Sequence, residues 1–221
     1  MTIDEMECHL LDKFDPLLLD CAPETEKELV FMYEAHSDIL YTYLQHVINP
    51  FLKTLCNELR AMLGHLSSYR LDNPHQTKRE LDKAYGHFRR FNIDALKILC
   101  NEFDRSLSRE LEKQYSYDFR SIVKDYLEEY SRRYFWAKNL YLLAQQEERV
   151  GSDYQKHNLI QLYHNAAKEY ICLKRYYMRW KKQIIRKRRW ETFKWLITIF
   201  AALFGTGVTI AGYIIPLLFV T

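Results

Sequence analysis

Apolar residues recur along the chain with the three-to-four-residue spacing of amphipathic helices. Thr25 and Glu28 have the spacing of a reciprocal N-terminal cap, which predicts a first helix from there to about Ile48. Asn49 and Pro50 then break or kink the chain. A second helix follows and carries six apolar residues on one face: Leu52, Leu55, Leu59, Met62, Leu63 and Leu66.

The same pattern predicts three more helices. A turn around Asn73 and Pro74 leads into a helix over about 76–103, whose buried stripe includes Asn92. A fourth, rich in aromatic residues, is expected over about 106–148, and a break at 151–153 precedes the last. We therefore predict an all-α fold, an antiparallel helical bundle with a long stalk helix that continues into a C-terminal transmembrane helix.

The C-terminal segment changes the picture most. Residues 195–220 form a run of 26 without a charge, longer than the roughly 20 needed to cross a bilayer as a helix. The alternatives are a buried core helix or a shallow hairpin that turns at 205–207. We expect four segments along the chain: an N-terminal segment at 1–23, the bundle at 24–150, the stalk with a basic juxtamembrane part at 151–194, and the span at 195–220.

Charge is distributed unevenly. The range Lys174–Lys194 holds ten Lys and Arg against one acid, so 22 basic and 28 acidic residues remain before it, about −6. A general basic surface for nucleic acid is thus absent from the body. Positive charge stays on the cytoplasmic side, which predicts a single-pass membrane protein with a cytosolic N-terminal domain. The residues expected at anionic lipid, with RNA as the alternative partner, are Arg179, Lys181, Lys182, Arg186, Lys187, Arg188 and Arg189.

Small residues recur within the predicted span. Ala201, Gly205, Thr209 and Gly212 are spaced by four, four and three positions, which places them on one helix face. Small faces let helices approach closely in lipid, so a homo-oligomer is expected. The ordinary enrichment of glycine in membrane helices is the alternative explanation.

Candidate chemistry lies in the stretch NELRAMLGHL and in the third helix. Arg60 and His65 are five positions apart, about 140° round a helix, so they meet only if a second copy supplies one of them or if the helix starts late. His87, Arg90 and Asp94 share a polar ridge, which is either a contact surface for RNA or a protein partner or a solvated face with ion pairs. No metal-ligand spacing or cofactor motif is present, so neither a metal nor a cofactor is expected.

These two segments, NELRAMLGHL and AYGHFRRFNIDALK, resemble the HEPN domains, helical bundles with an Arg four to six residues before a His. The resemblance covers roughly 24–104. It implies a metal-independent ribonuclease of paired protomers, in which Arg60 holds the scissile phosphate and His65 moves the proton of the 2′-hydroxyl. Ala61 departs from the family, which commonly has Asn after the Arg. Such proteins often serve as toxins or antiviral effectors in bacteria, so the resemblance implies that the predicted span lies in the cell inner membrane.

Three functions follow as hypotheses. The first is a membrane effector of bacterial antiphage or abortive-infection type, whose bundle, held by a regulatory protein or ribonucleoprotein partner, controls the assembly of spans that compromise the membrane. The second is a membrane-tethered ribonuclease that uses Arg60 and His65 across a dimer. The third is a passive tail-anchored scaffold. Assembly through the small-residue face favours the first, because an enzyme needs no assembling span.

Overall fold

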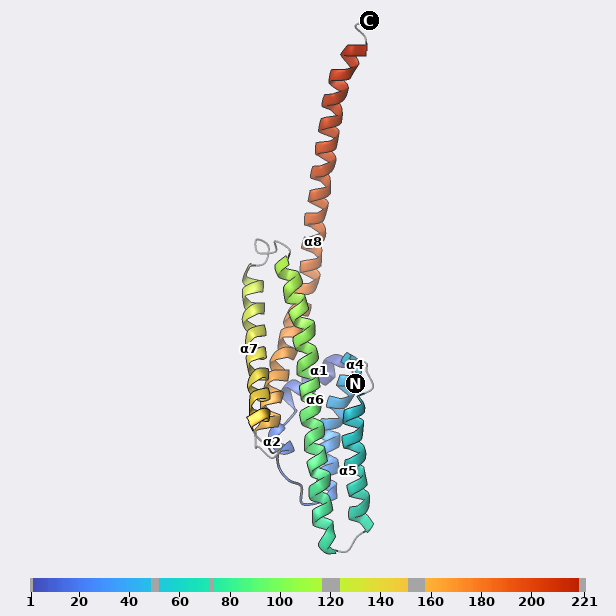
Figure 1. Cartoon of the computed structure of the whole chain (residues 1–221), viewed down its shortest axis with the longest axis vertical. Coiled ribbons are helices and arrows are strands. Elements are labelled where there is room, and N and C mark those ends of the chain that lie inside the picture. Colours follow the sequence, from blue (N-terminus) through green and yellow to red (C-terminus); the bar gives the residue numbers. More distant parts are fainter. Residues whose placement is uncertain (1, 49–51, 72–73, 117–123, 151–157, 219–221) are drawn as a thin grey trace. The chain divides into compact units, whose positions relative to one another are not determined.

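The computed structural model describes the chain apart from residues 1, 49–51, 72–73, 117–123, 151–157 and 219–221 (Figure 1). Every regular element in the described part is helical and none is a strand, which confirms the predicted all-α class. The chain divides into two compact units, residues 1–175 and 176–221. Most of the buried apolar residues lie in the first unit.

The N-terminal segment, to which the apolar pattern assigned no element, contains two helices. Helix α1 spans Ile3–Asp12 and begins at a capping box in which Thr2 is the N-cap. Helix α2 spans Pro16–Leu19, and its N-cap Asp15 accepts hydrogen bonds from two backbone N–H groups of the first turn. Packing of α1 on α4 brings this segment into the bundle.

The first predicted helix is present as a continuous helical stretch with a π-helical turn. It comprises α3 (Glu26–Met32), the π-helix η1 (Tyr33–Ser37) and α4 (Asp38–Ile48). A π-turn holds one residue more than an α-helical turn, and it brings Ser37 into the core at zero exposure. The Ser37 hydroxyl there donates to Oδ1 of Asn92 over 2.7 Å.

Only one of the two hydrogen bonds of the predicted reciprocal cap forms at the start of α3. Thr25 accepts a hydrogen bond from the N–H of Glu28, as expected. The Glu28 carboxylate instead accepts from the N–H of Glu24 over 2.7 Å, so it caps the residue before the N-cap.

Helices α5 (Lys53–Leu71) and α6 (Pro74–Ser116) form an antiparallel hairpin within the first unit (Figure 1). The apolar face predicted for α5 is buried or half-buried except at Leu63, which is 59% exposed. Its neighbours Met62 and Leu66 take the inward positions of that turn. The stripe predicted on α6 is confirmed as buried or half-buried, with Asn92 fully enclosed.

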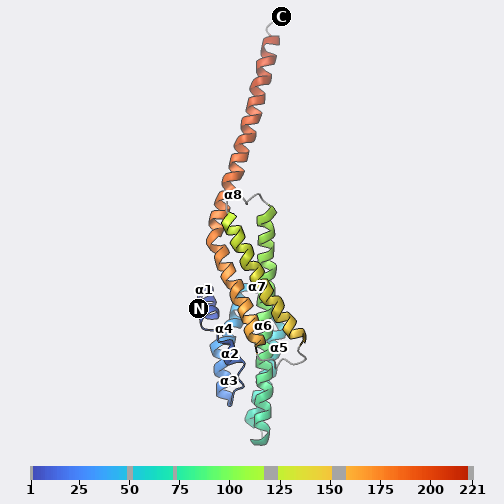
Figure 2. The same cartoon turned by 90° about the vertical axis from the view of Figure 1, so that its left-hand side faces the viewer.

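The boundary between the third and fourth helices was predicted wrongly. Helix α6 continues to Ser116, beyond the expected end near 103, because Phe103 and Leu107 extend its buried face without a helix breaker. Helix α7 then spans Lys124–Val150 and packs on α6 (Figure 2). It ends just before Gly151, as the sequence predicted.

The last helix, α8, spans Leu159–Leu218 in 60 residues. It follows Asn158, whose φ of 96° lies in the left-handed region that Asn tolerates better than most residues. The predicted continuity of this helix through the basic segment is confirmed. The backbone stays helical through 205–207, so the shallow hairpin considered for that position is wrong. Among the described residues, no helix has the length and apolar character that a bilayer crossing requires.

Candidate functional site

Two histidines that sequence analysis assigned to separate sites lie against each other between α5 and α6. His65 on α5 and His87 on α6 stack with their ring centroids 5.3 Å apart and their planes 17° from parallel. Both rings remain partly accessible, since 29% of the His65 side chain and 20% of the His87 side chain are exposed. The hairpin turn near Pro74 makes this contact possible, because it folds α6 back along α5.

Each imidazole is held by a carboxylate from the opposite helix. Nδ1 of His65 lies 2.7 Å from Oε2 of Glu80, and Nδ1 of His87 lies 2.8 Å from Oε2 of Glu58. An ionised carboxylate only accepts hydrogen bonds, so both Nδ1 atoms carry a proton. In its neutral form each ring then has its lone pair on Nε2, the nitrogen with which it can take up a further proton.

Both carboxylates have a cation beside them. Hydrogen bonds from Lys83, whose Nζ is 2.5 Å from Oε1, and from His65 hold the pKa of Glu80 below its ordinary value. At the other end, Arg90 Nε is 3.9 Å from Oε2 of Glu58. The four residues therefore form a row, Glu58–His87–His65–Glu80, with positive charge at each end.

A repeated sequence produces this arrangement. The row is built from ELRAMLGH at 58–65 and ELDKAYGH at 80–87, both of the form Glu-Leu, four residues, Gly-His. A separation of seven residues puts Glu and His on the same face of a helix, two turns apart. In an antiparallel pair, each His can then reach the Glu of the other helix. Sequence analysis missed Glu58 and Glu80, and this repeat was the signal that would have found them.

Asp94, predicted to share the ridge with His87 and Arg90, lies outside the row. Burial raises the pKa of its carboxyl group above the ordinary value, and the charge of Glu58 adds to the shift, although Lys97 opposes it. The Lys97 ammonium group instead donates to Glu148 of α7 over 2.7 Å. This end of the ridge therefore contributes to helix packing between α6 and α7.

Arg60 is exposed and stands apart from the histidines. Helix α5 begins at Lys53, so Arg60 lies within the helix, which excludes the late helix start considered from the sequence. Its side chain makes no hydrogen bond or ion pair with any residue that the structure describes. At about 100° per residue it is roughly 140° round the axis from His65. Cooperation between Arg60 and His65 thus requires a second copy of the chain.

His164 lies outside the row, in the part of the chain that the structure describes. Within that part, no three His, Cys, Asp or Glu side chains gather as metal ligands. His164 is buried, and its Nε2 donates to the carbonyl oxygen of Leu10 over 2.9 Å. It therefore joins α8 to α1. His157 lies outside the described residues.

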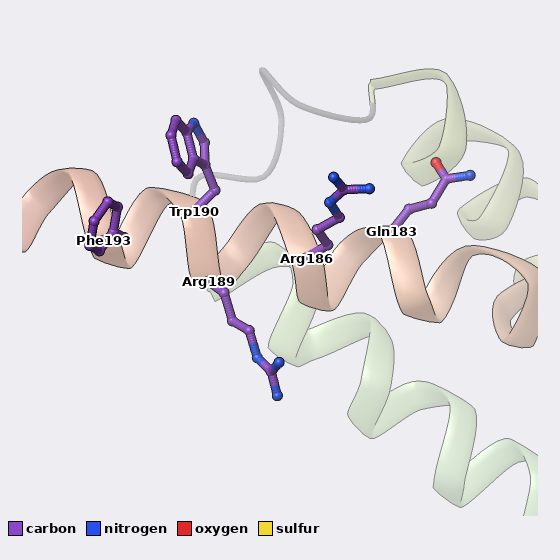
Figure 3. Close-up of a pocket in the computed structure, with 5 residues that line it drawn as sticks. All are labelled: Gln183, Arg186, Arg189, Trp190 and Phe193. Carbon is purple, nitrogen blue, oxygen red and sulfur yellow. The ribbon is translucent and has the colours of Figure 1, made fainter.

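The basic segment of α8 presents its charges to the surroundings. Of the residues predicted to meet lipid, those described are exposed: Arg179, Lys181, Lys182, Arg186 and Arg189. The side chains of Lys187 and Arg188 lie outside the described residues. Figure 3 shows Gln183, Arg186 and Trp190 on one side of the helix and Arg189 on the other. Two guanidinium groups and one indole ring thus line a pocket along this helix, together with Gln183 and Phe193.

Of the small residues predicted to pack spans together, Ala201 is exposed on α8. The side-chain positions of Gly205, Thr209 and Gly212 lie outside the described residues, although the backbone there is helical. Their common face therefore stays a prediction from spacing.

Comparison of the chain with known protein families, with curated proteins and with solved structures finds no match. The resemblance to HEPN domains accordingly rests on the two quoted segments alone.

Proposed function

We propose that the chain is a membrane-anchored effector of bacterial antiphage or abortive-infection type. Its HEPN-like helical body lies in the cytosol under the control of a partner. The C-terminal part of α8 crosses the inner membrane, and assembly of several such helices compromises that membrane.

The observation that carries this proposal is a run of exposed apolar residues on α8. Eight large apolar side chains are between 43% and 72% exposed: Trp190, Phe193, Trp195, Leu196, Ile197, Phe200, Leu203 and Phe204. At about 100° per residue seven of them lie within an arc of about 140°, and Trp195 lies outside it. The other sides of the helix carry no charge either from Trp195 onward. Lipid supplies an environment that suits an uncharged helix of this length. The uncharged sequence continues to residue 220.

The basic segment supports the same arrangement. Its exposed Lys and Arg residues directly precede the apolar run, where they would meet the negative surface of the cytoplasmic leaflet. Trp190 and Trp195 lie at the transition, a position that amphipathic rings favour in membrane proteins. Lys194 lies over the Trp190 ring, 5.7 Å from its centroid, and pairs with Glu191 over 3.0 Å. The only acid of the segment is thereby neutralised.

The face of small residues distinguishes an effector from a passive anchor. Ala201, Gly205, Thr209 and Gly212 lie within about 80° of one another round the axis, whereas Gly207 lies on the opposite side. Close helix packing through the small face would align several spans. A passive tether has no use for such a face.

Expression in bacteria with a potential-sensitive dye tests the proposal. Wild-type chain should collapse the membrane potential. Gly205→Leu and Gly212→Leu should reach the membrane in equal amount but leave the potential intact, because leucine keeps the helices apart. Gly207→Leu makes the same chemical change on the opposite face and should retain the effect. Cell death with an unchanged potential, or equal loss in all three variants, would contradict the proposal.

The carboxylate-held His65 favours a second candidate, a membrane-tethered ribonuclease that needs no metal. Its Nδ1 is fixed by Glu80, so Nε2 is available for proton transfer, while the exposed Arg60 is available to a phosphate across a dimer. Arg60→Ala and His65→Ala should then abolish both RNA cleavage and toxicity. Toxicity that survives both changes would remove this candidate.

A further inference from the structure

We infer that His65 and His87 form a complete acid–base pair within one chain, which cleaves RNA phosphodiester bonds without a contribution from a second copy. The substrate class rests on the ribonuclease candidate above. The assignment of both catalytic groups to a single hairpin rests on the row Glu58–His87–His65–Glu80.

The two rings are prepared for proton transfer in the same way. In each, a carboxylate accepts the Nδ1 proton, over 2.7 Å for His65 and 2.8 Å for His87, and thereby fixes the tautomer and the ring orientation. Nε2 is left as the exchanging atom of both rings. A single histidine needed only for packing would not require a matching second copy of this arrangement.

Stacking gives the rings complementary roles. Two positively charged imidazolium rings with centroids 5.3 Å apart repel each other, whereas one charged and one neutral ring do not. A charged ring can thus lie beside a neutral one in this stack. The charged groups that face it are Glu58 and Glu80, together with their cationic neighbours Lys83 and Arg90. One ring then acts as an acid while the other acts as a base.

This combination matches the chemistry of RNA, which carries its own nucleophile. The neutral ring takes the proton of the 2′-hydroxyl at Nε2, and the 2′-oxygen forms a bond to phosphorus. The bond between phosphorus and the 5′-oxygen breaks, and the charged ring donates its Nε2 proton to that oxygen. The products are a 2′,3′-cyclic phosphate and a 5′-hydroxyl, and the second ring is left neutral. A return of the proton between the rings restores the starting state.

Lys83 and Arg90 give the site positive charge at both ends of the row. Each side chain is 40% exposed, so each remains accessible from solvent although it neighbours a carboxylate. They are the groups on the hairpin that would hold the phosphates on either side of the scissile bond.

The test uses the purified full chain in detergent micelles with end-labelled single-stranded RNA and EDTA. The variants His65→Asn and His87→Asn keep a donor in place of Nδ1 but lack Nε2. Each should cut the rate about 100-fold or more, and the double variant should lose little beyond either single one. His46→Asn changes an exposed histidine of α4 and should cleave as the wild type does. Cyclic phosphate ends should accumulate.

Glu58 is a positioning residue, so its test needs a readout beyond activity. Glu58→Gln should leave the thermal midpoint close to that of the wild type but lower the rate and displace one limb of the pH–rate profile. His87→Asn should remove that same limb. A profile that keeps its shape in both variants would overturn the assignment of His87.

Mixed samples separate one-chain from two-chain catalysis. A mixture of His65→Asn and His87→Asn chains should stay inactive, because neither chain holds the complete pair; recovered activity would overturn the single-chain site. Loss of cleavage in Arg60→Ala and His65→Asn but not in His87→Asn would overturn the inference and leave the ribonuclease candidate standing. Absence of cleavage by the wild type would remove both, while the membrane proposal is decided separately by the potential-sensitive dye.

Discussion

Asn92 lies on the buried stripe of α6, where its neighbours are apolar. Its Nδ2 donates to the carbonyl oxygen of Phe88 over 2.9 Å, and its Oδ1 accepts from Ser37. Ser37 reaches this position because of the π-turn in η1. The pair therefore joins the first helical stretch to α6 by a hydrogen bond with a defined direction, in a region where the neighbouring contacts are apolar.

Asn92→Leu should lower the free energy of unfolding by about 1–3 kcal/mol, because the Ser37 hydroxyl is then buried without an acceptor. Chemical denaturation of the full chain in detergent measures the loss. Asn101→Leu changes an exposed residue of the same helix and should have little effect. The double variant Asn92→Leu with Ser37→Ala should recover part of the stability, and failure to do so would argue against the hydrogen bond as the cause.

At the same scale, the sequence identified the histidines of the candidate site but not its carboxylates. His65 stood out through its spacing from Arg60, and His87 through its place on the polar ridge, whereas Glu58 and Glu80 are ordinary residues for a helix surface. Their roles depend on the antiparallel register of two helices, which periodicity within one helix does not reveal. The exposure of Leu63 has a similar origin, since the width of a buried face depends on the neighbouring helix.

At the scale of elements, α1 is attached to the bundle through one buried carboxylate. Glu7, with 3% of its side chain exposed, accepts hydrogen bonds from Tyr43 over 2.8 Å, Lys174 over 2.7 Å and Arg175 over 3.0 Å. The cations come from the end of the first unit and the tyrosine from α4. Sequence analysis assigned Lys174 and Arg175 to the basic run and missed this contact, because their partner lies more than 160 positions away.

Histidines reinforce the same attachment. His164 donates to Leu10 and stacks on Phe14 with centroids 4.7 Å apart, and His36 lies against Phe14 at 5.4 Å. Burial lowers the pKa of both His36 and His164 below the ordinary value of 6.5. For Glu7, burial alone would raise the pKa, but the hydrogen bonds from Lys174, Arg175 and Tyr43 outweigh it and hold the pKa below 4.5.

These directions predict that α1 detaches in acid. A histidine whose folded pKa is lowered stabilises the folded state above its unfolded pKa, and this contribution is lost as the pH falls below about 6.5. The contribution of Glu7 is lost further down, below about 4.5. Hydrogen exchange should show faster opening of α1 at pH 5 than at pH 7, with α7 as the internal reference. Equal protection of α1 at both values would contradict the prediction.

Glu7→Gln should produce the same detachment at neutral pH. The substitution leaves Lys174 and Arg175 without their carboxylate, which costs about 3 kcal/mol for a buried ion pair broken on one side. Amides of α1 should exchange faster by the corresponding factor, while those of α6 keep their rates. Asp12→Asn, at an exposed position of α1, is the matched control. If both variants exchange alike, the buried carboxylate is not what holds α1.

For the whole molecule, the apolar pattern predicted the helical class, the number of long helices and the break before α8. Those features depend on local spacing and on glycine and proline, which a single sequence displays directly. The end of α6 was predicted near residue 103, whereas the helix continues through Asp104 to Ser116. In the structure Asp104 accepts hydrogen bonds from Tyr134 of α7 and Tyr170 of α8, each over 2.9 Å. Such contacts between helices are not visible in local spacing.

Two interactions are expected to hold the molecule at a membrane, and their dependence on salt concentration distinguishes them. Attraction of the basic segment to anionic lipid is electrostatic and weakens as salt screens it, whereas insertion of the apolar run does not. The full chain should therefore remain on anionic vesicles in 1 M salt. A chain that ends at Lys194 should bind them at low salt and be released at high salt. Release of both chains together would show that the apolar run adds nothing.

The truncated chain also allows the contribution of individual charges to be measured. Replacing Lys181, Lys182, Arg186 and Arg189 by Gln should weaken its binding to anionic vesicles by roughly fivefold per charge, since each basic residue near the surface is worth about 1 kcal/mol. Replacing exposed lysines of the first unit makes the same change in net charge: Lys13, Lys27, Lys53 and Lys78 to Gln. If the juxtamembrane segment is the lipid-binding surface, vesicle flotation should show almost no loss of binding for the variant with the second set of substitutions. An equal loss in both sets would instead assign the binding to net charge, because only a localised surface distinguishes two chains of identical total charge.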